Sequence, residues 1–261
     1  PIQCRKPYAA ASTSSTRLAK IIAAHKKNRF MAPFCPDDTP VFPHFSFCIF
    51  PCTLKRDNSM KLYYSPGACS LSAHIAMHEA GLPFEAIAAP TKTHQLPDGT
   101  DYYTINPLGY VPYLTLDNGK SLHEGPAIVQ YIADQVPGKS LAPPNGTYER
   151  YKLQEWLTFI GTELHKTFSP LFSPATPAET KTGSMDKLQN RLKWVNGELA
   201  GKQYLMGDTF TVADGYLFTV TNWAGRVGVD LTPFTNLLAY RERVGARPAV
   251  IAAMKAEGLI K

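Results

Sequence analysis

The stretch MKLYYSPGACSLSAHIAMHEAG, residues 60–81, decides the fold. Residues 61–64 are typical of a short β-strand, and a Ser-Pro-Gly turn follows them. Residues 70–80 favour a helix, and Gly81 stands where a helix C-terminus prefers glycine. The candidates for the inward face of this helix are Leu71, Ile75, Met77 and His78.

The residues after this unit predict a small mixed sheet. Strand patterns recur at 84–89, 111–116 and 121–124, the last two joined by a hairpin turn at Asp117-Asn118-Gly119. A helix pattern covers 126–136. A βαβ crossover followed by a ββα unit gives a four-stranded sheet flanked by helices, which is the plan of the thioredoxin fold. We therefore expect an α/β thioredoxin-like N-terminal domain over 60–137.

The second half of the chain carries no strand pattern. Residues 138–147, rich in Pro, Gly and Asn, are typical of a linker. Beyond them one apolar stripe steps by 3, 1, 3 and 4 residues, the period of a helix face: Leu153, Trp156, Leu157, Ile160 and Leu164. We expect 148–261 to form an all-α helical C-terminal domain of three or more helices, packed on the first domain.

Residues 1–59 differ from the rest in composition. They hold seven prolines, nine of the 27 Lys/Arg and only three of the 21 Asp/Glu, which leaves 18 charges of each sign in residues 60–261. The net charge of +6 therefore belongs to this leader and does not indicate a nucleic-acid-binding domain. The leader is predicted to be disordered, or sequence upstream of a misassigned start, with a targeting extension as the alternative.

The overall composition bounds the class of protein. It is 44% hydrophobic and 18% charged, and no apolar run approaches the ~18 residues of a membrane span, so we expect a globular protein without membrane association. Cys69 is the only cysteine in residues 60–261, which excludes a disulfide within that part and favours a reducing, cytoplasmic setting. Cys48 and Cys52 have metal-like spacing without a second ligand pair, so no metal site is expected.

Cys69 is the strongest candidate for chemistry. It precedes the predicted helix, where the partial positive charge of the N-terminus lowers a thiol pKa, and Ser70 or Ser72 can cap that end. Cys69-Ser-Leu-Ser72 is a C-x-x-S sequence, in which a hydroxyl replaces the resolving thiol. A lone thiolate needs an external partner, and glutathione is an abundant one. A buried, inert cysteine is the alternative.

Several motifs together resemble those of a cytosolic glutathione transferase. In order they are SPGACS (65–70), N-P-x-G-x-V-P (106–112) and E-G-x-A-I-x-x-Y (124–131). TELHK (162–166) and FTVADGYLF (210–218) are similar to the bacterial beta class in particular. The resemblance covers residues 60–261 and implies a glutathione transferase fold.

The resemblance also implies a glutathione site. It suggests that Pro112 is cis, that Val111 offers its backbone N–H and C=O to the cysteinyl unit, and that Glu124 pairs with the γ-glutamyl ammonium. Gly125 stands where relatives often have Ser, so only its backbone N–H is available. Relatives also often carry Lys where His94 stands, which leaves His94 as a glutathione-binding candidate by position.

Thr158, Thr162 and His165 step by 4 and 3 residues and so form one polar helix face. The resemblance suggests that His165 and Lys166 overhang the thiol and contribute positive charge, with Cys69 and His165 as catalytic residues. Relatives often have Asn at the position of Thr158. Tyr64 and Ser70 are further site-lining candidates. Four aromatic candidates face the second substrate: Phe168, Phe172, Tyr216 and Trp223.

The expected function is conjugation of reduced glutathione, as co-substrate, to small hydrophobic electrophiles, in a homodimer without a tightly bound cofactor. Thiol–disulfide exchange or peroxide reduction through Cys69 stays open beside it. Two rivals are a non-catalytic binding or regulatory protein of the same fold and nucleic-acid binding through the leader. Thr211-Val-Ala-Asp214 is predicted to be a structural capping box.

Overall fold

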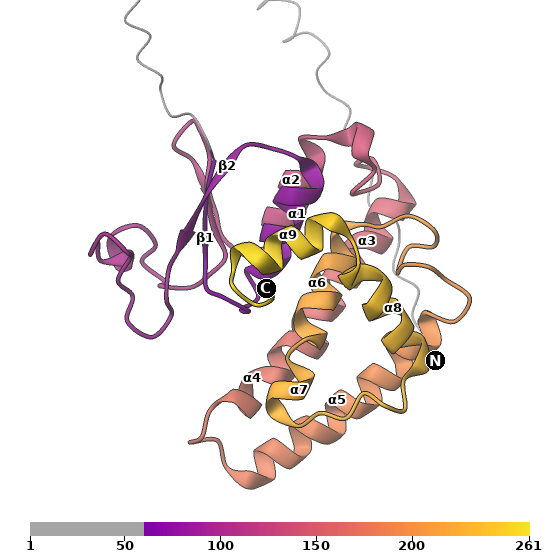
Figure 1. The fold of residues 1–261 in the computed structure, drawn as a ribbon. Helices are drawn as coiled ribbons and strands as arrows, with labels where there is room; N and C mark the ends of the chain where they lie inside the picture. The colour runs from indigo at the N-terminus through magenta and orange to yellow at the C-terminus, as the bar shows by residue number, and fades with distance from the viewer. Residues whose placement is uncertain (1–59) are drawn as a thin grey trace, which may run out of the picture. The chain divides into compact units, whose positions relative to one another are not determined.

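The computed structural model describes residues 60–261. The interpretations of residues 1–59, including the leader and the Cys48/Cys52 pair, lie outside the described residues. A sheet with its helices forms the first half of the described part, and a group of helices forms the second (Figure 1). Within residues 60–261 the longest helix is too polar, and every other helix too short, to cross a membrane.

The predicted mixed sheet is confirmed. Its strands are β1 (Met60–Tyr64), β2 (Phe84–Ala88), β3 (Tyr113–Thr115) and β4 (Ser121–Leu122), in the spatial order β2-β1-β3-β4. β1 pairs with β2 in parallel, and β3 is antiparallel to both β1 and β4. β3 starts two residues later than predicted because Pro112 has no N–H to donate, and β4 ends two residues earlier than predicted.

Two helices flank this sheet. α1 (Leu71–Ala80) ends at Gly81, whose left-handed backbone (φ 67°) lets its N–H reach the carbonyls of Met77 and His78. α2 (Gly125–Asp134) starts one residue earlier and ends two residues earlier than predicted. Short 3₁₀ helices, η2 (Tyr102–Thr104) and η3 (Pro137–Lys139), lie where the sequence suggested only loop and linker.

The predicted serine cap of α1 is wrong. Ser70 Oγ instead accepts from the N–H of Ser65, 3.1 Å away, and Ser72 Oγ donates to the carbonyl of Cys69. Because Ser70 itself has helical backbone angles, its hydroxyl faces back to the turn and not toward the free N–H groups of α1. Ser70 therefore stabilises the turn that carries Cys69.

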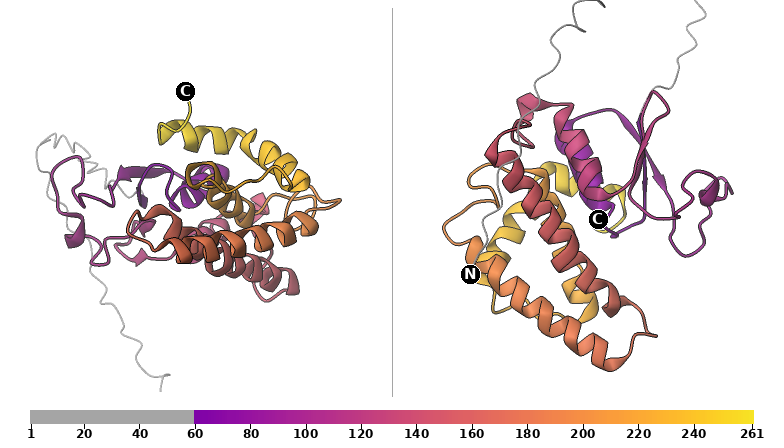
Figure 2. Two further views of the ribbon diagram at one scale, coloured as in Figure 1. Left: turned by 90° about the horizontal axis from the view of Figure 1, so that it is seen from below. Right: turned by 180° about the vertical axis from the view of Figure 1, so that it is seen from behind.

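The second half is all-helical, as predicted. Its helices are α3 (Tyr148–Phe159), the π-helical η4 (Ile160–His165), α4 (Lys166–Phe172), α5 (Ala178–Glu198), α6 (Val212–Thr221), α7 (Ala224–Val227), α8 (Thr235–Gly245) and α9 (Pro248–Ala256). The apolar stripe from Leu153 to Leu164 is buried at every position. The other two views show these helices gathered beside α1 and α2 (Figure 2).

One apolar core joins the two halves. All ten residues of α6 are buried, and α6 and α9 both pack on α1 (Figure 1). Gly215 allows the close approach, since a Cβ there would lie 3.3 Å from Ile75 Cγ2. This packing fixes the helical half against the loop that carries Cys69, so residues far apart in sequence can share one site.

Candidate functional site

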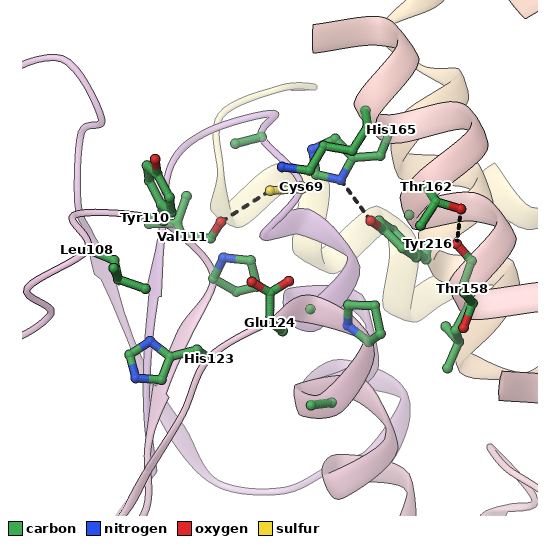
Figure 3. Close-up of a pocket in the computed structure, with 18 of the residues that line it drawn as sticks. Cys69, Leu108, Tyr110, Val111, His123, Glu124, Thr158, Thr162, His165 and Tyr216 are labelled. Atoms are coloured by element: carbon green, nitrogen blue, oxygen red, sulfur yellow. Dashed lines mark hydrogen bonds between the residues drawn. The ribbon is translucent and has the colours of Figure 1, made fainter.

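A cavity of about 730 Å³ opens between the loops of the sheet and the helical half. Its walls come from the Cys69 loop, the loop before β3, the start of α2, the α3–η4 segment and α6 (Figure 3). Nine of the predicted site residues line it: Cys69, Val111, Pro112, Glu124, Gly125, Thr158, Thr162, His165 and Lys166. Eleven further residues line the cavity that the sequence did not indicate.

Cys69 lines this cavity and is partly buried. Its Sγ donates a hydrogen bond to the carbonyl of Val111, at 3.1 Å. Burial raises the pKa of this thiol to about 11, although hydrogen bonds from the backbone N–H groups of Cys69 and Ser70 act in the opposite direction. The expectation of a lowered pKa is wrong, because desolvation outweighs the helix start. At neutral pH the unliganded protein holds Cys69 as a thiol.

The loop before β3 supplies a backbone edge to the cavity. The Val111–Pro112 peptide bond is cis, as the resemblance implied. Gly109 has a positive φ of 65°, and a Cβ there would come within 2.7 Å of the Tyr103 ring. The carbonyl of Tyr110 accepts from both Tyr102 Oη and Asn106 Nδ2. These bonds hold the turn that presents Val111.

Glu124 stands at the start of α2 in an unusual backbone conformation. Its φ of 63° and ψ of 114° fall in a region that residues other than glycine rarely adopt. The side chain is exposed and lies over the cavity (Figure 3). Such a strained residue at a cavity wall is typical of a ligand contact, and the helix N-terminus behind it favours an anionic group.

His165 enters the cavity from the end of η4. Its Nδ1 lies 2.7 Å from Tyr216 Oη, and Trp223 packs against its ring at 4.9 Å between centroids. Burial, with a smaller effect from Lys166, lowers the pKa of His165 to about 4. The expectation that His165 contributes positive charge is therefore wrong: the imidazole is neutral at physiological pH. Among the cavity-lining residues only Lys166 is a lysine or arginine.

Thr158 and Thr162 form part of the opposite wall. Each hydroxyl donates to the carbonyl four residues earlier, that of Gln154 at 2.8 Å and that of Thr158 at 3.0 Å. The donor of each hydroxyl is thus occupied, and only oxygen lone pairs remain for a ligand. This wall presents acceptors and methyl groups.

Three of the candidates for the glutathione site, and three of the four aromatic candidates, do not line the cavity. His94 stacks on Tyr103 at 4.4 Å between ring centroids, with a positive φ of 53°. Tyr64 packs against His74, and Ser70 is fully buried under the turn. Of the four aromatic candidates only Tyr216 lines the cavity, because Phe168 and Phe172 pack on Trp223 and the Trp223 Nε1–H donates to the carbonyl of Gly67.

Sequence reasoning also missed several residues that line the cavity. They are Ala68, Thr91, Asn106, Leu108, Tyr110, His123, Pro126, Ala127, Gln130, Leu157 and Gly161. Asn106, Leu108 and Tyr110 fall inside the N-P-x-G-x-V-P motif, which could have indicated them. Pro126, Ala127 and Gln130 likewise fall inside the E-G-x-A-I-x-x-Y motif, whereas His123 belongs to no motif that could have indicated it.

Comparison with known proteins gives the family. The model of the glutathione S-transferase N-terminal domain matches residues 67–135, and that of the C-terminal domain matches 159–248. Glutathione S-transferase GstA of Escherichia coli O157:H7 is 46% identical over 200 residues, covering 77% of this chain and 100% of the relative. Glutathione S-transferase GST-4.5 of Xanthomonas campestris pv. campestris is 38% identical over 207 residues, with 77% and 100% covered.

Solved structures agree. The ternary complex of BphK, a bacterial glutathione transferase, is 56% identical with a TM-score of 0.75, covering 76% of this chain and 99% of that one. A sphingomonad glutathione S-transferase complexed with glutathione is 47% identical (TM-score 0.74; 77% and 100% covered), and a bacterial beta-class enzyme from Sphingomonas chungbukensis is 48% identical (TM-score 0.74; 77% and 100% covered). From the two domain matches, these identities and the shared fold, the chain belongs to the glutathione S-transferase family and is similar to its bacterial beta class.

Proposed function

We propose that this protein conjugates reduced glutathione to small hydrophobic electrophiles. The observation that carries the proposal is a cavity of about 730 Å³. In it the cis Val111–Pro112 peptide and Glu124 face His165 and Tyr216. A tripeptide can lie along the sheet loops while an electrophile sits against the helices. The sphingomonad relative complexed with glutathione supports the same ligand here.

Each part of the tripeptide has a complementary group. The backbone of Val111 would bind the cysteinyl unit, and Glu124 would pair with the γ-glutamyl ammonium. The N–H of Gly125, at the start of α2, would bind the γ-glutamyl carboxylate. Lys166 would attract the glycyl carboxylate. His94 keeps this last role only if it leaves Tyr103, against which it stacks at 4.4 Å.

The chemical step is a substitution at carbon. The glutathione thiol gives its proton to water, and the thiolate sulfur attacks the electrophilic carbon. A C–S bond forms, and the leaving group departs with its electron pair. No tightly bound cofactor is needed, because the nucleophile comes from glutathione itself.

Thiol exchange through Cys69 is the second candidate, because its sulfur faces the same cavity. In that reaction the Cys69 thiolate attacks a glutathione mixed disulfide, and the released thiolate takes a proton from water. A second glutathione then reduces the Cys69–glutathione disulfide and leaves as oxidised glutathione. The raised pKa of Cys69, about 11, ranks this activity below conjugation.

Cys69→Ala separates the two reactions. We expect the variant to keep most of its activity with an aryl halide and to lose reduction of a mixed disulfide. Glu124→Ala, measured beside it, should weaken glutathione binding by about tenfold, since it removes the partner of the ammonium. Wild-type protein that is folded but does not bind glutathione-agarose would contradict the proposal and favour a non-catalytic binding protein.

We also propose that the protein is a homodimer that acts in detoxification in the cytoplasm. Large exposed side chains support a second copy, among them Leu108, Tyr110, Tyr148 and Tyr151. The single cysteine in residues 60–261 suits a reducing compartment. Light scattering after size-exclusion chromatography should give twice the chain mass; a mass of 28.8 kDa would contradict the dimer.

A further inference from the structure

Tyr216 and His165 form a buried polar pair within the cavity. They come from α6 and η4 and lie 51 residues apart, yet Oη and Nδ1 are only 2.7 Å from each other. Their rings meet edge to face, and Trp223 closes the other side of the imidazole. The tyrosine side chain is 4% exposed, so its hydroxyl depends on the protein for a partner.

The position of each proton follows from this pair. Burial, with Cys69 and Glu124 nearby, raises the pKa of Tyr216, so the phenol keeps its proton. Among the described residues, Nδ1 of His165 is the one partner that this hydroxyl has. If Nδ1 carried the ring proton, the phenol would have no acceptor and a buried O–H would be unsatisfied, which is costly. Tyr216 therefore donates to Nδ1.

A neutral imidazole holds one proton, so in this arrangement the proton lies on Nε2. The other ring nitrogen, Nε2, does not face Tyr216, and His165 lines the same cavity as Cys69 (Figure 3). His165 thus presents a neutral N–H donor to the place where a ligand's sulfur would lie beside Cys69. An imidazole with a free Nε2 lone pair would instead repel a sulfur anion.

We propose that Tyr216 is a positioning residue that locks His165 in its Nε2–H tautomer, so that the neutral imidazole donates a hydrogen bond to the reacting sulfur. The inference rests on the proposed function, since the sulfur is that of bound glutathione. It assigns His165 the role of a hydrogen-bond donor, and neither a general base nor a cation. Tyr216 acts only through His165.

The first test reads the tautomer directly and needs no activity. Long-range ¹H–¹⁵N NMR of full-length protein with ¹⁵N-labelled histidine separates Nε2–H from Nδ1–H rings, and His165→Gln identifies the signal. We expect Nε2–H in the wild type and a shift toward Nδ1–H in Tyr216→Phe. An Nδ1–H ring in the wild type, or no change in Tyr216→Phe, would overturn the proposal even if the protein proves to be an active transferase.

The second test is a mutant cycle on conjugation. Tyr216→Phe should lower kcat/KM by roughly tenfold, mostly through kcat, with KM for glutathione changed by less than about twofold. His165→Gln keeps an N–H donor near the Nε2 position and has no tautomer to lock, whereas His165→Asn places its amide near Nδ1. Gln should therefore retain more activity than Asn, and Tyr216→Phe should change the Gln variant by less than about twofold.

The matched control is Tyr240→Phe. Tyr240 is another buried tyrosine, but its hydroxyl bonds Asp214, away from the cavity. This variant should leave kcat/KM within about twofold of the wild type. If Tyr216→Phe costs the same activity in the His165→Gln background as in the wild type, Tyr216 is only a packing residue and the inference fails. Absent activity in the wild type would instead contradict the proposed function, while the NMR result still decides the tautomer.

Discussion

At the scale of single residues, burial outweighs local charge in this site. Cys69 stands at a helix start, and His165 precedes a lysine and lies over the thiol by resemblance, so each position suggested an ionised side chain. Desolvation instead raises the pKa of Cys69 to about 11 and lowers that of His165 to about 4. In the unliganded cavity Cys69 and His165 are therefore both neutral, and they act there through hydrogen bonds and not through charge.

The lowered pKa of His165 makes stability depend on pH. In the unfolded chain a histidine takes up a proton below 6.5, whereas His165 in the folded protein stays neutral until about pH 4. The unfolded state binds the extra proton, so stability is lost as pH falls through this window. Between about pH 7 and about pH 4.5 the wild type should lose at most about 3 kcal/mol from this group.

The measurement compares urea unfolding of the wild type and His165→Gln across that range. The side chain of the glutamine variant at this position does not titrate. The unfolding free energy of the wild type minus that of the variant should therefore shrink or reverse as pH falls. All other groups cancel in this difference, including the buried Asp214. Parallel stability curves would contradict the lowered pKa.

At the scale of elements, α6 depends on its N-terminus. The carboxylate of Asp214 accepts from the N–H and the hydroxyl of Thr211, from the N–H of Leu205 and from Tyr240 Oη. The predicted capping box is thus confirmed and extended, since the same carboxylate ties α6 to α8 and to the loop before it. This cap fixes the start of α6, the helix that carries Tyr216 and packs on α1.

Asp214→Ala should be far more damaging than loss of an ordinary cap. The change leaves buried N–H and O–H groups without an acceptor, and we expect it to lower the unfolding free energy by about 3 kcal/mol. Thr147→Ala removes a cap at α3, where Thr147 Oγ1 accepts from Arg150 N–H near the surface, and should cost about 1 kcal/mol. Chemical denaturation measures both; equal losses would show that the buried network adds nothing beyond the cap.

At the scale of the whole molecule, the far end of the chain holds the loop of Cys69. Glu257, after α9, accepts from the N–H of Gly67 at 2.8 Å and bonds His74 Nδ1 at 3.0 Å. The Trp223 Nε1–H donates to the carbonyl of the same Gly67, at 2.9 Å. Both backbone groups of one glycine in the turn are therefore held by side chains of the helical half.

Glu257→Ala should destabilise the protein strongly. It leaves the buried His74 ring and the partly buried Gly67 N–H without their partner, and we expect a loss of about 3 kcal/mol in unfolding free energy. Glu155→Ala is the matched control, because Glu155 pairs with Lys152 on the surface and should contribute less than about 1 kcal/mol. Thermal unfolding ranks the two variants; similar melting temperatures would mean that the buried contact is not stabilising.

The sequence by itself determined the elements and their order. Periodicity identified β1, α1, α2 and the α3–η4 stripe, and turn residues such as Gly81 marked their ends, because these signals depend on neighbours along the chain. The same local motifs placed nine site residues on the cavity. The predicted start of β3 was wrong because Pro112 cannot donate to the sheet, and the serine cap of α1 was wrong because Ser70 bonds Ser65 instead, a contact that no pattern encodes.

Only the tertiary structure decided the protonation and the partners of the site. Cys69 and His165 become partly buried only in the folded chain, and the Tyr216–His165 contact joins residues 51 positions apart. His94 stood at a binding position in sequence, yet its ring lies on Tyr103. Desolvation and long-range contacts depend on which surfaces meet, and no local pattern specifies that, so the chemistry of this site became visible only in the folded chain.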